Sequence, residues 1–293
     1  SHFRSMDIWH TCEPEKLADE GWLGRAIRDL DPNKKNVLTG VNFGRGLPRA
    51  MAAAGVPVAS VGNLETYGVL TTIEAEQDRT KALDIFSRMY SPAMGRGPVL
   101  EYLSQTGMDA LSGADILATA PAKYSSSVEY GGDPFAQWVK NIAQVHLAEF
   151  GTRIFYTSLA PGDFDTHANQ MTLFPKLWSE VSNAVSDLYE DLKEHHANEE
   201  VVILMFTEFG RRVQENGSGT DHGSGGVAFV MGDPVKGGLY GEYPSLDREK
   251  LDEGDLQWNN DFRGTYATLL ESWLGVDSKP IVGGSYEQFD FIK

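Results

Sequence analysis

Apolar residues in this chain fall into short continuous runs and into longer segments in which they recur every three or four positions. Short runs rich in β-branched and aromatic side chains predict buried strands, whereas the longer spacing predicts helices. Strands are predicted over residues 36–43, 56–61, 153–159, 201–206 and 227–231. Helices are predicted over residues 21–30, 49–54, 73–90, 97–113, 135–150 and 262–274, with breaks at Pro92, Gly95 and Gly97 and with Asp261 as cap of the last helix.

The clearest helix follows residue 167. Its apolar stripe consists of Leu173, Leu177, Val181, Val185, Leu188 and Leu192. Because helices separate most of the predicted strands, the pattern predicts the α/β class, with a mostly parallel central sheet and helices on both of its faces. Ligands gather at the carboxyl ends of strands in such sheets, so polar residues directly after a strand are the first candidates for a functional site.

Asp163, Asp165 and His167 follow the predicted strand 153–159. In an extended loop, a spacing of two points the side chains of Asp165 and His167 the same way. Carboxylate with imidazole suits zinc, manganese or iron better than calcium or magnesium. A second interpretation stays open, in which Asp165 or Thr166 caps the following helix and His167 is a polar surface residue.

Glu208 comes just after the apolar run 201–206. A carboxylate at the end of a buried strand is costly unless it is paired or bound to a metal. Glu208 is therefore either a metal ligand or the partner of Arg211 or Arg212. Arg211 could instead hold an anionic substrate through its guanidinium fork.

The segment 217–226 contains five glycines around Asp221 and His222. Glycines allow tight turns and close approach of the backbone to a ligand. We interpret the segment as a rigid loop that presents His222 beside Asp221, with a flexible surface loop as the alternative. The remaining histidines are assigned to structure or stay ambiguous: His195 and His196 suit a helix end, His146 lies within a helix, and His2 and His10 are ambiguous.

Acidic residues outnumber basic ones by 42 to 25, which gives the 293-residue chain a formal charge of −17. This charge repels a phosphate backbone and argues against nucleic-acid binding, although metal and arginine charge can still attract a small anion. No apolar run reaches the roughly 18 residues of a membrane span. Cys12 is the single cysteine, so no internal disulfide forms. The glycine spacing in residues 40–46 does not fit the dinucleotide-binding fingerprint, which disfavours a nucleotide-dependent oxidoreductase.

Several motifs occur in a characteristic order. They are Ser1-His2-Phe3, Gly21-Trp-Leu-Gly-Arg25, Phe164-Asp-Thr-His-Ala-Asn-Gln170, Thr207-Glu-Phe-Gly-Arg211, Gly219-Thr-Asp-His-Gly223, Val230-Met-Gly232, Asp261-Phe-Arg263 and Tyr266-Ala-Thr-Leu-Leu-Glu-Ser-Trp-Leu-Gly275. The series resembles the bacterial domain-of-unknown-function family 1501, which is placed with the alkaline phosphatase and sulfatase superfamily. The resemblance spans nearly the whole chain and is loosest over residues 60–135.

The resemblance implies one or two divalent metals at strand ends and hydrolysis or transfer of phosphate or sulfate esters. By this resemblance Asp165, His167, Glu208, Asp221 and His222 are metal ligands. The implied metal is zinc, with manganese, calcium or magnesium as alternatives. Members of the family tend to carry an export signal, which implies a periplasmic or secreted location.

Family members also have a further N-terminal segment with a first strand and an aspartate-bearing turn. Residues 1–293 are therefore expected to form a single alkaline-phosphatase-like domain without that segment. Ser1 is the candidate nucleophile, because a hydroxyl at a helix start beside metals can be activated, and Arg211 is the candidate group that steadies the anion. The expected function is a metal-dependent hydrolase of small sulfate or phosphate esters. The alternative is a non-catalytic, metal-stabilised secreted or surface binding protein of the same fold.

Overall fold

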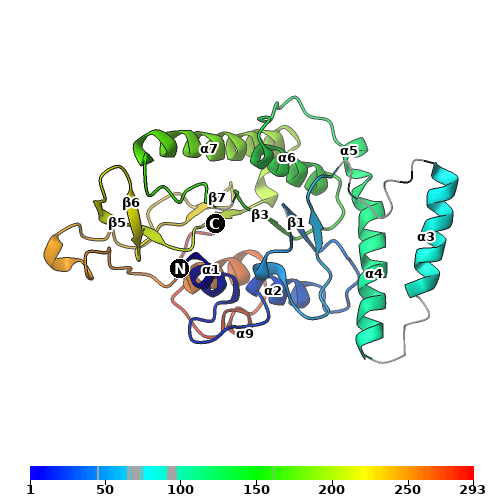
Figure 1. Cartoon of the computed structure of the whole chain (residues 1–293), viewed down its shortest axis with the longest axis horizontal. Coiled ribbons are helices and arrows are strands. Elements are labelled where there is room, and N and C mark those ends of the chain that lie inside the picture. Colours follow the sequence, from blue (N-terminus) through cyan, green and yellow to red (C-terminus); the bar gives the residue numbers. More distant parts are fainter. Residues whose placement is uncertain (45, 65–66, 68–72, 74, 91–97, 161) are drawn as a thin grey trace.

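The computed structural model describes residues 1–44, 46–64, 67, 73, 75–90, 98–160 and 162–293 (Figure 1). A three-stranded parallel sheet lies at its centre. The strands are β1 (Gly40–Phe43), β2 (Ala59–Val61) and β3 (Ile154–Thr157), in the order β2-β1-β3. The register places Val41 opposite Ala59 on one side and opposite Phe155 on the other.

Two further pairs of strands are antiparallel. Strand β4 (Ile203–Met205) pairs with β7 (Phe229–Met231), and β5 (Gly210–Glu215) pairs with β6 (Thr220–Gly223). The α/β class is thus confirmed, and among the described residues parallel order is limited to β2-β1-β3. The expectation of an irregular loop over residues 217–226 is wrong for its centre, since Thr220–Gly223 is a strand whose hydrogen-bonding partner is the segment after Glu208.

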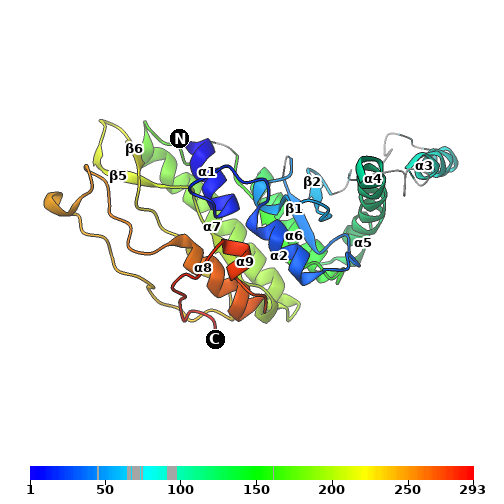
Figure 2. The ribbon, with the colours of Figure 1, turned by 90° about the horizontal axis from the view of Figure 1, so that it is seen from below.

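The helices bound the strands on two sides. They are α1 (His2–Thr11), α2 (Trp22–Leu30), α3 (Glu76–Tyr90), α4 (Pro98–Leu117), α5 (Ala120–Lys123), α6 (Pro134–Leu147), α7 (Gln170–Glu194), α8 (Phe262–Thr268) and α9 (Lys279–Val282), with a π-helical turn at Leu269–Trp273 and 3-10 turns at Arg49–Met51, Asn198–Glu200 and Arg248–Lys250. In Figure 1, α6 and α7 lie above the strands, whereas α1, α2 and α9 lie below them. Helix α4 packs against the end of the sheet next to β2, where its last residue Leu117 is buried in the core, and α3 lies beyond α4 (Figure 2).

Helix boundaries follow local chemistry. The Asp133 carboxylate accepts a hydrogen bond from the backbone N–H of Ala136 at the start of α6, and Pro134 occupies the first turn, where its missing N–H costs nothing. The predicted cap at Asp261 is confirmed, because its side chain accepts from the N–H of Arg263. The helix expected over residues 49–54 is only a short 3-10 turn, and the breaks predicted at Pro92, Gly95 and Gly97 lie outside the described residues.

The buried side chains of the described residues form three core clusters. One lies between α2 and α8 and includes Trp22 stacked on Tyr266 with ring centroids 3.9 Å apart. A second surrounds Val41 and Phe43 of β1. The third joins α6 and α7. In the apolar stripe of α7, Val181, Leu188 and Leu192 are buried and Val185 is partly buried, whereas Leu173 is exposed.

None of the helices in the described part of the chain has the length and apolar character of a membrane span.

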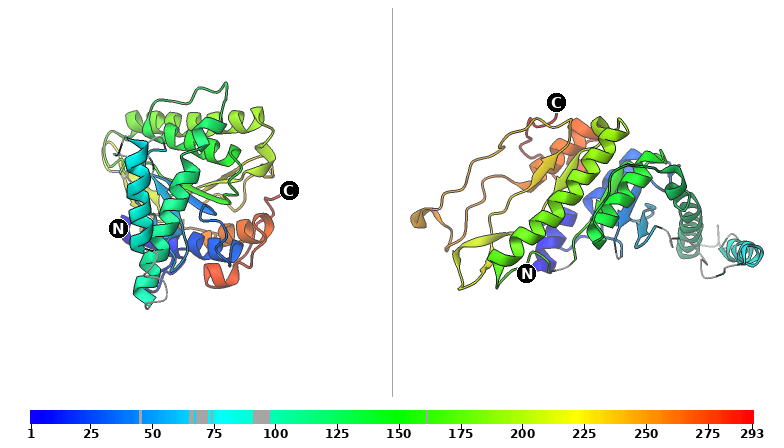
Figure 3. Two further views of the ribbon diagram at one scale, coloured as in Figure 1. Left: turned by 90° about the vertical axis from the view of Figure 1, so that its right-hand side faces the viewer. Right: turned by 90° about the horizontal axis from the view of Figure 1, so that it is seen from above.

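The elements that carry the candidate site residues meet on one side of the molecule. Figure 3 shows the N-terminus beside the hairpin of β5 and β6 and beside the first turns of α7. This arrangement places the first residues of the chain within reach of residues 165–222.

Candidate metal centre

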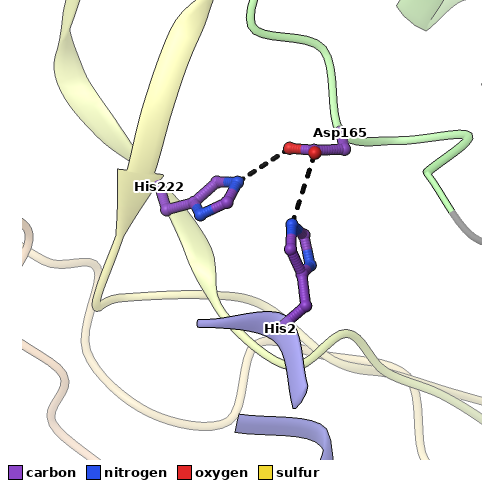
Figure 4. A group of neighbouring side chains, drawn as sticks. All are labelled: His2, Asp165 and His222. Carbon is purple, nitrogen blue, oxygen red and sulfur yellow. Dashed lines mark hydrogen bonds and ion pairs between the residues drawn. The ribbon is translucent and has the colours of Figure 1, made fainter. Parts of the chain in front are cut away.

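Polar side chains from four separate segments converge on one surface site. His2 begins α1, Asp165 and His167 lie in the loop after β3, Glu208 lies in the loop after β4, and Asp221 and His222 belong to β6. In Figure 4, His2 and His222 point at the two carboxylate oxygens of Asp165. His222 Nε2 is 2.7 Å from Asp165 Oδ1, and His2 Nε2 is 3.3 Å from Asp165 Oδ2. The structure therefore brings the five sequence-predicted ligand residues together and adds His2.

The β5–β6 hairpin and the loop after β3 fit together through backbone contacts. Gln170 at the start of α7 donates its backbone N–H to the carbonyl of Ser218 over 2.9 Å. A Cβ on Gly219 would overlap the backbone of His167 and Thr166. Only glycine allows this close approach, which sets His167 beside Asp221 and His222.

Three atoms form a tight triangle at the centre of the site. Asp165 Oδ1 lies 2.7 Å from His222 Nε2 and 3.0 Å from His167 Nε2, and the two nitrogens are 3.0 Å apart. An ionised carboxylate oxygen only accepts hydrogen bonds, so both imidazoles would have to donate from Nε2. The third side of the triangle would then bring two N–H groups face to face. No arrangement of protons makes all three sides hydrogen bonds.

A cation removes this conflict, because all three atoms can then offer lone pairs to it. Zinc binds nitrogen and oxygen at about 2.0–2.2 Å, so two neighbouring ligand atoms on one ion are about 3.0 Å apart in octahedral geometry and about 3.4 Å apart in tetrahedral geometry. The sides of the triangle, at 2.7 to 3.0 Å, are close to the octahedral spacing and would widen slightly around a tetrahedral ion. Furthermore, the potential ligand atoms of His2, Asp165 and His222 all lie within 4.8 Å of one another. The donor set of imidazoles with one carboxylate suits zinc or another borderline transition metal.

His2 is held on its far side by Glu208. His2 Nδ1 is 2.6 Å from Glu208 Oε1, and the Thr207 hydroxyl donates to Glu208 Oε2 over 2.9 Å. The ring of Phe209 lies against both imidazoles, with centroids 4.9 Å from His2 and 4.3 Å from His222. This packing restricts the rotation of both rings.

His167 is held in the same manner by Asp221. His167 Nδ1 is 3.1 Å from Asp221 Oδ1, and Asn216 donates its side-chain amide to the same oxygen over 3.0 Å. His167 and Asp221 are both exposed, with about half of each side chain open to solvent at 45% and 57%. The site is therefore open to a small molecule from this side.

The three carboxylates of the site are held in their ionised form. A hydrogen bond from His222 lowers the pKa of Asp165 to about 2, further helped by the nearby His167. Burial raises the pKa of Glu208, but hydrogen bonds from His2 and Thr207 outweigh burial and lower it overall. Hydrogen bonds from Asn216 and His167 lower the pKa of Asp221. Three negative charges next to one guanidinium, that of Arg211, favour a cation.

Arg211 points into the protein. Its guanidinium donates to the carbonyl oxygens of Thr220 and Phe164, over 2.7 and 2.6 Å, and lies 3.2 Å from Asp165 Oδ1. These bonds fasten the loop after β3 to the β5–β6 hairpin. Ser1, the candidate nucleophile, is exposed at the start of α1, directly before His2, and its side chain makes no capping hydrogen bond.

Sequence reasoning did not select His2. The other site residues follow or flank predicted strands, whereas His2 lies on a helix that was not predicted, and its partners are 163 and 206 positions away in sequence. The signal for His2 in the sequence is its place in the Ser1-His2-Phe3 motif, directly after the candidate nucleophile Ser1.

Comparison with known proteins supports one assignment. Residues 13–272 match the family described as "Protein of unknown function (DUF1501)". The matched region contains Asp165, His167, Glu208, Asp221 and His222, while His2 lies before it. No curated protein and no solved structure matches the chain. Because the match covers most of its length, the chain belongs to the DUF1501 family.

Proposed function

We propose that this protein is a metal-dependent hydrolase of sulfate or phosphate esters, with a single domain related to the alkaline phosphatase and sulfatase superfamily. The observation that carries the proposal is the triangle of Asp165 Oδ1, His167 Nε2 and His222 Nε2, whose geometry suits a shared cation better than hydrogen bonds. In this proposal β2-β1-β3 and the β4–β7 pair correspond to parts of that superfamily's central sheet.

The residues that would hold the metal are His2, Asp165, His167 and His222. Bound there, a divalent ion would polarise an ester oxygen and lower the pKa of a nearby hydroxyl or water. The chain's own residues would do the rest. Arg211 fixes the Asp165 carboxylate, Phe209 holds the imidazole rings, and Ser1 supplies the candidate nucleophilic hydroxyl beside His2. By resemblance, a periplasmic or secreted location accompanies this function.

The first experiment measures metal and turnover on the same samples. The chain is stripped with a chelator, reloaded with zinc, and assayed by elemental analysis and with p-nitrophenyl phosphate and p-nitrophenyl sulfate. We expect about one or more zinc ions per chain and activity only after loading. His222→Ala should lose the metal, because it removes one corner of the triangle, whereas His146→Ala should keep it, since His146 lies in α6 beside Glu200. An equal esterase rate in stripped and loaded protein would overturn the mechanism.

A second candidate function is a metal-stabilised binding protein without turnover. The inward hydrogen bonds of Arg211 favour it, because they occupy the guanidinium that the sequence suggested would hold the substrate anion. In that case zinc binds as above, neither ester is hydrolysed, and Ser1→Ala changes nothing. Zinc binding with ester turnover that Ser1→Ala abolishes would exclude this candidate.

A further inference from the structure

We infer that Glu208 and Asp221 are positioning residues that fix the tautomers of His2 and His167, in place of the ligand role that the sequence predicted for them. Each carboxylate faces the Nδ1 atom of one imidazole, on the side away from Asp165. The inference rests on the proposed metal function, and it concerns which atoms of the chain face the cation.

Thr207, Glu208 and His2 form a chain of hydrogen bonds. The Thr207 hydroxyl donates to Glu208 Oε2, so the carboxylate is oriented before it meets the ring. Glu208 Oε1 is 2.6 Å from His2 Nδ1. Because an ionised carboxylate can only accept, this contact requires a proton on Nδ1. His2 Nε2 faces Asp165 Oδ2 over the longer distance of 3.3 Å, so in neutral His2 the closer Glu208 keeps the proton on Nδ1 and the lone pair is on Nε2.

Asn216, Asp221 and His167 form a second chain of hydrogen bonds of the same kind. Asn216 donates its amide to Asp221 Oδ1, and the same oxygen is 3.1 Å from His167 Nδ1. His167 Nε2 is about as close to Asp165 Oδ1, at 3.0 Å, so a cation in the triangle is what leaves the proton on Nδ1 and the lone pair on Nε2. His222 differs, since its contacts with Asp165 and His167 both use Nε2.

The two carboxylate–imidazole pairs share one arrangement, in which the carboxylate contacts Nδ1, and this repetition supports a role in the site. A metal-bound imidazole commonly donates its other N–H to a carboxylate, which fixes the ring and raises its basicity. Loss of such a partner lowers metal affinity by about 10- to 100-fold.

Nitrogen NMR of the histidine side chains tests the inference in stripped and in zinc-loaded protein. At a pH where the imidazoles are neutral, we expect His2 to carry its proton on Nδ1 in both forms, and His167 to do so once zinc is loaded. In Asp221→Ala, His167 should change toward the Nε2-protonated form while His2 stays unchanged, and Glu208→Ala should do the reverse. Glu190→Ala, an exposed acid on α7, is the matched control and should change neither ring. A proton on Nε2 of His2, or on Nε2 of His167 once zinc is loaded, in the unmodified protein would overturn the inference.

Zinc titration separates positioning from ligation. Asp221→Ala and Glu208→Ala should weaken zinc binding about 10- to 100-fold, and Glu208→Gln should restore most of it, because the amide oxygen still accepts from Nδ1 and still has the right length. Affinity that stays as low in Glu208→Gln as in Glu208→Ala would show that the negative charge itself binds the metal, against the inference. If the unmodified chain binds no zinc while His2 carries its proton on Nδ1, the proposed function fails and the positioning role of Glu208 stands.

Discussion

The hydrogen bonds of one side chain, His195, favour its charged form. His195 ends α7, and its two ring nitrogens face carbonyl oxygens, with Nδ1 2.8 Å from Asp191 O and Nε2 2.9 Å from Ser125 O. Carbonyls only accept, so both nitrogens must carry protons and the ring is cationic. The same bonds raise the pKa of His195, led by the one to Asp191, and the nearby Glu194 adds to the effect.

Stability should therefore depend on pH through His195. Because its pKa is raised on folding, its contribution is complete below the unfolded value near 6.5 and is lost as the pH rises through the higher folded value. We expect the free energy of unfolding, measured by urea denaturation from pH 5 to pH 9, to fall over the alkaline part of this window. In His195→Ala this part of the pH dependence should vanish. An unchanged slope in that variant would contradict the assignment.

For single residues, the sequence indicates which side chains belong to the site but only some of the contacts between them. Asp165, His167, Glu208 and His222 were selected because each follows or flanks an apolar run, and the structure brings them together. Sequence position could not reveal that Glu208 faces His2, since this contact joins residues 206 positions apart. The alternative pairing of Glu208 with Arg211 or Arg212 was equally reasonable from spacing, yet Arg212 pairs with Asp255 and Arg211 contacts Asp165.

Among the elements, the β5–β6 hairpin decides the shape of the site. It was expected as a loop because five glycines interrupt any apolar pattern, and propensity alone gives such a segment no partner. In the structure these glycines allow close backbone approach. A Cβ on Gly223 would overlap the backbone of Arg211, and one on Gly210 would overlap Gly225. Arg211 therefore lies opposite His222 because of backbone contacts between separate segments, and the local sequence pattern does not show these contacts.

Gly219→Ala tests the fit of this hairpin against the loop after β3. The added methyl would overlap the backbone of His167 and Thr166, so one of the two segments must move. We expect a loss of about 1–3 kcal/mol in the free energy of unfolding and weaker zinc binding, because His167 moves with its loop. Gly237→Ala is the control, since a Cβ there has no atom within 4 Å. Equal zinc affinity in both variants would show that the loop adapts without disturbing His167.

For the whole molecule, the sequence predicted the α/β class, and the structure confirms it. The predicted helices over residues 21–30 and 135–150 match α2 and α6 closely because their apolar spacing and boundary residues are local. The division of the strands into β2-β1-β3 and two antiparallel pairs was not predictable, since strand pairing joins segments whose order in space no local pattern records.

Metal binding should stabilise the whole chain, because the site joins α1, the loop after β3 and β6. A ligand that binds only the folded state at about 100 times its dissociation constant adds about 2.7 kcal/mol, which corresponds to a rise of about 5 °C in Tm for a chain of this size. We expect this rise when zinc is added to stripped protein in differential scanning calorimetry. His222→Ala should show none. A similar rise in that variant would mean that zinc binds elsewhere.

The distance along the chain between His2 and His222 has a consequence for biosynthesis. His2 leaves the ribosome first, whereas its partners Asp165 and His222 are made much later. The complete ligand set does not exist until residue 222 has been translated and its hairpin has closed. Uptake of the proposed cation would therefore begin only after that stage, and the ions available where folding finishes would then decide which metal the site receives.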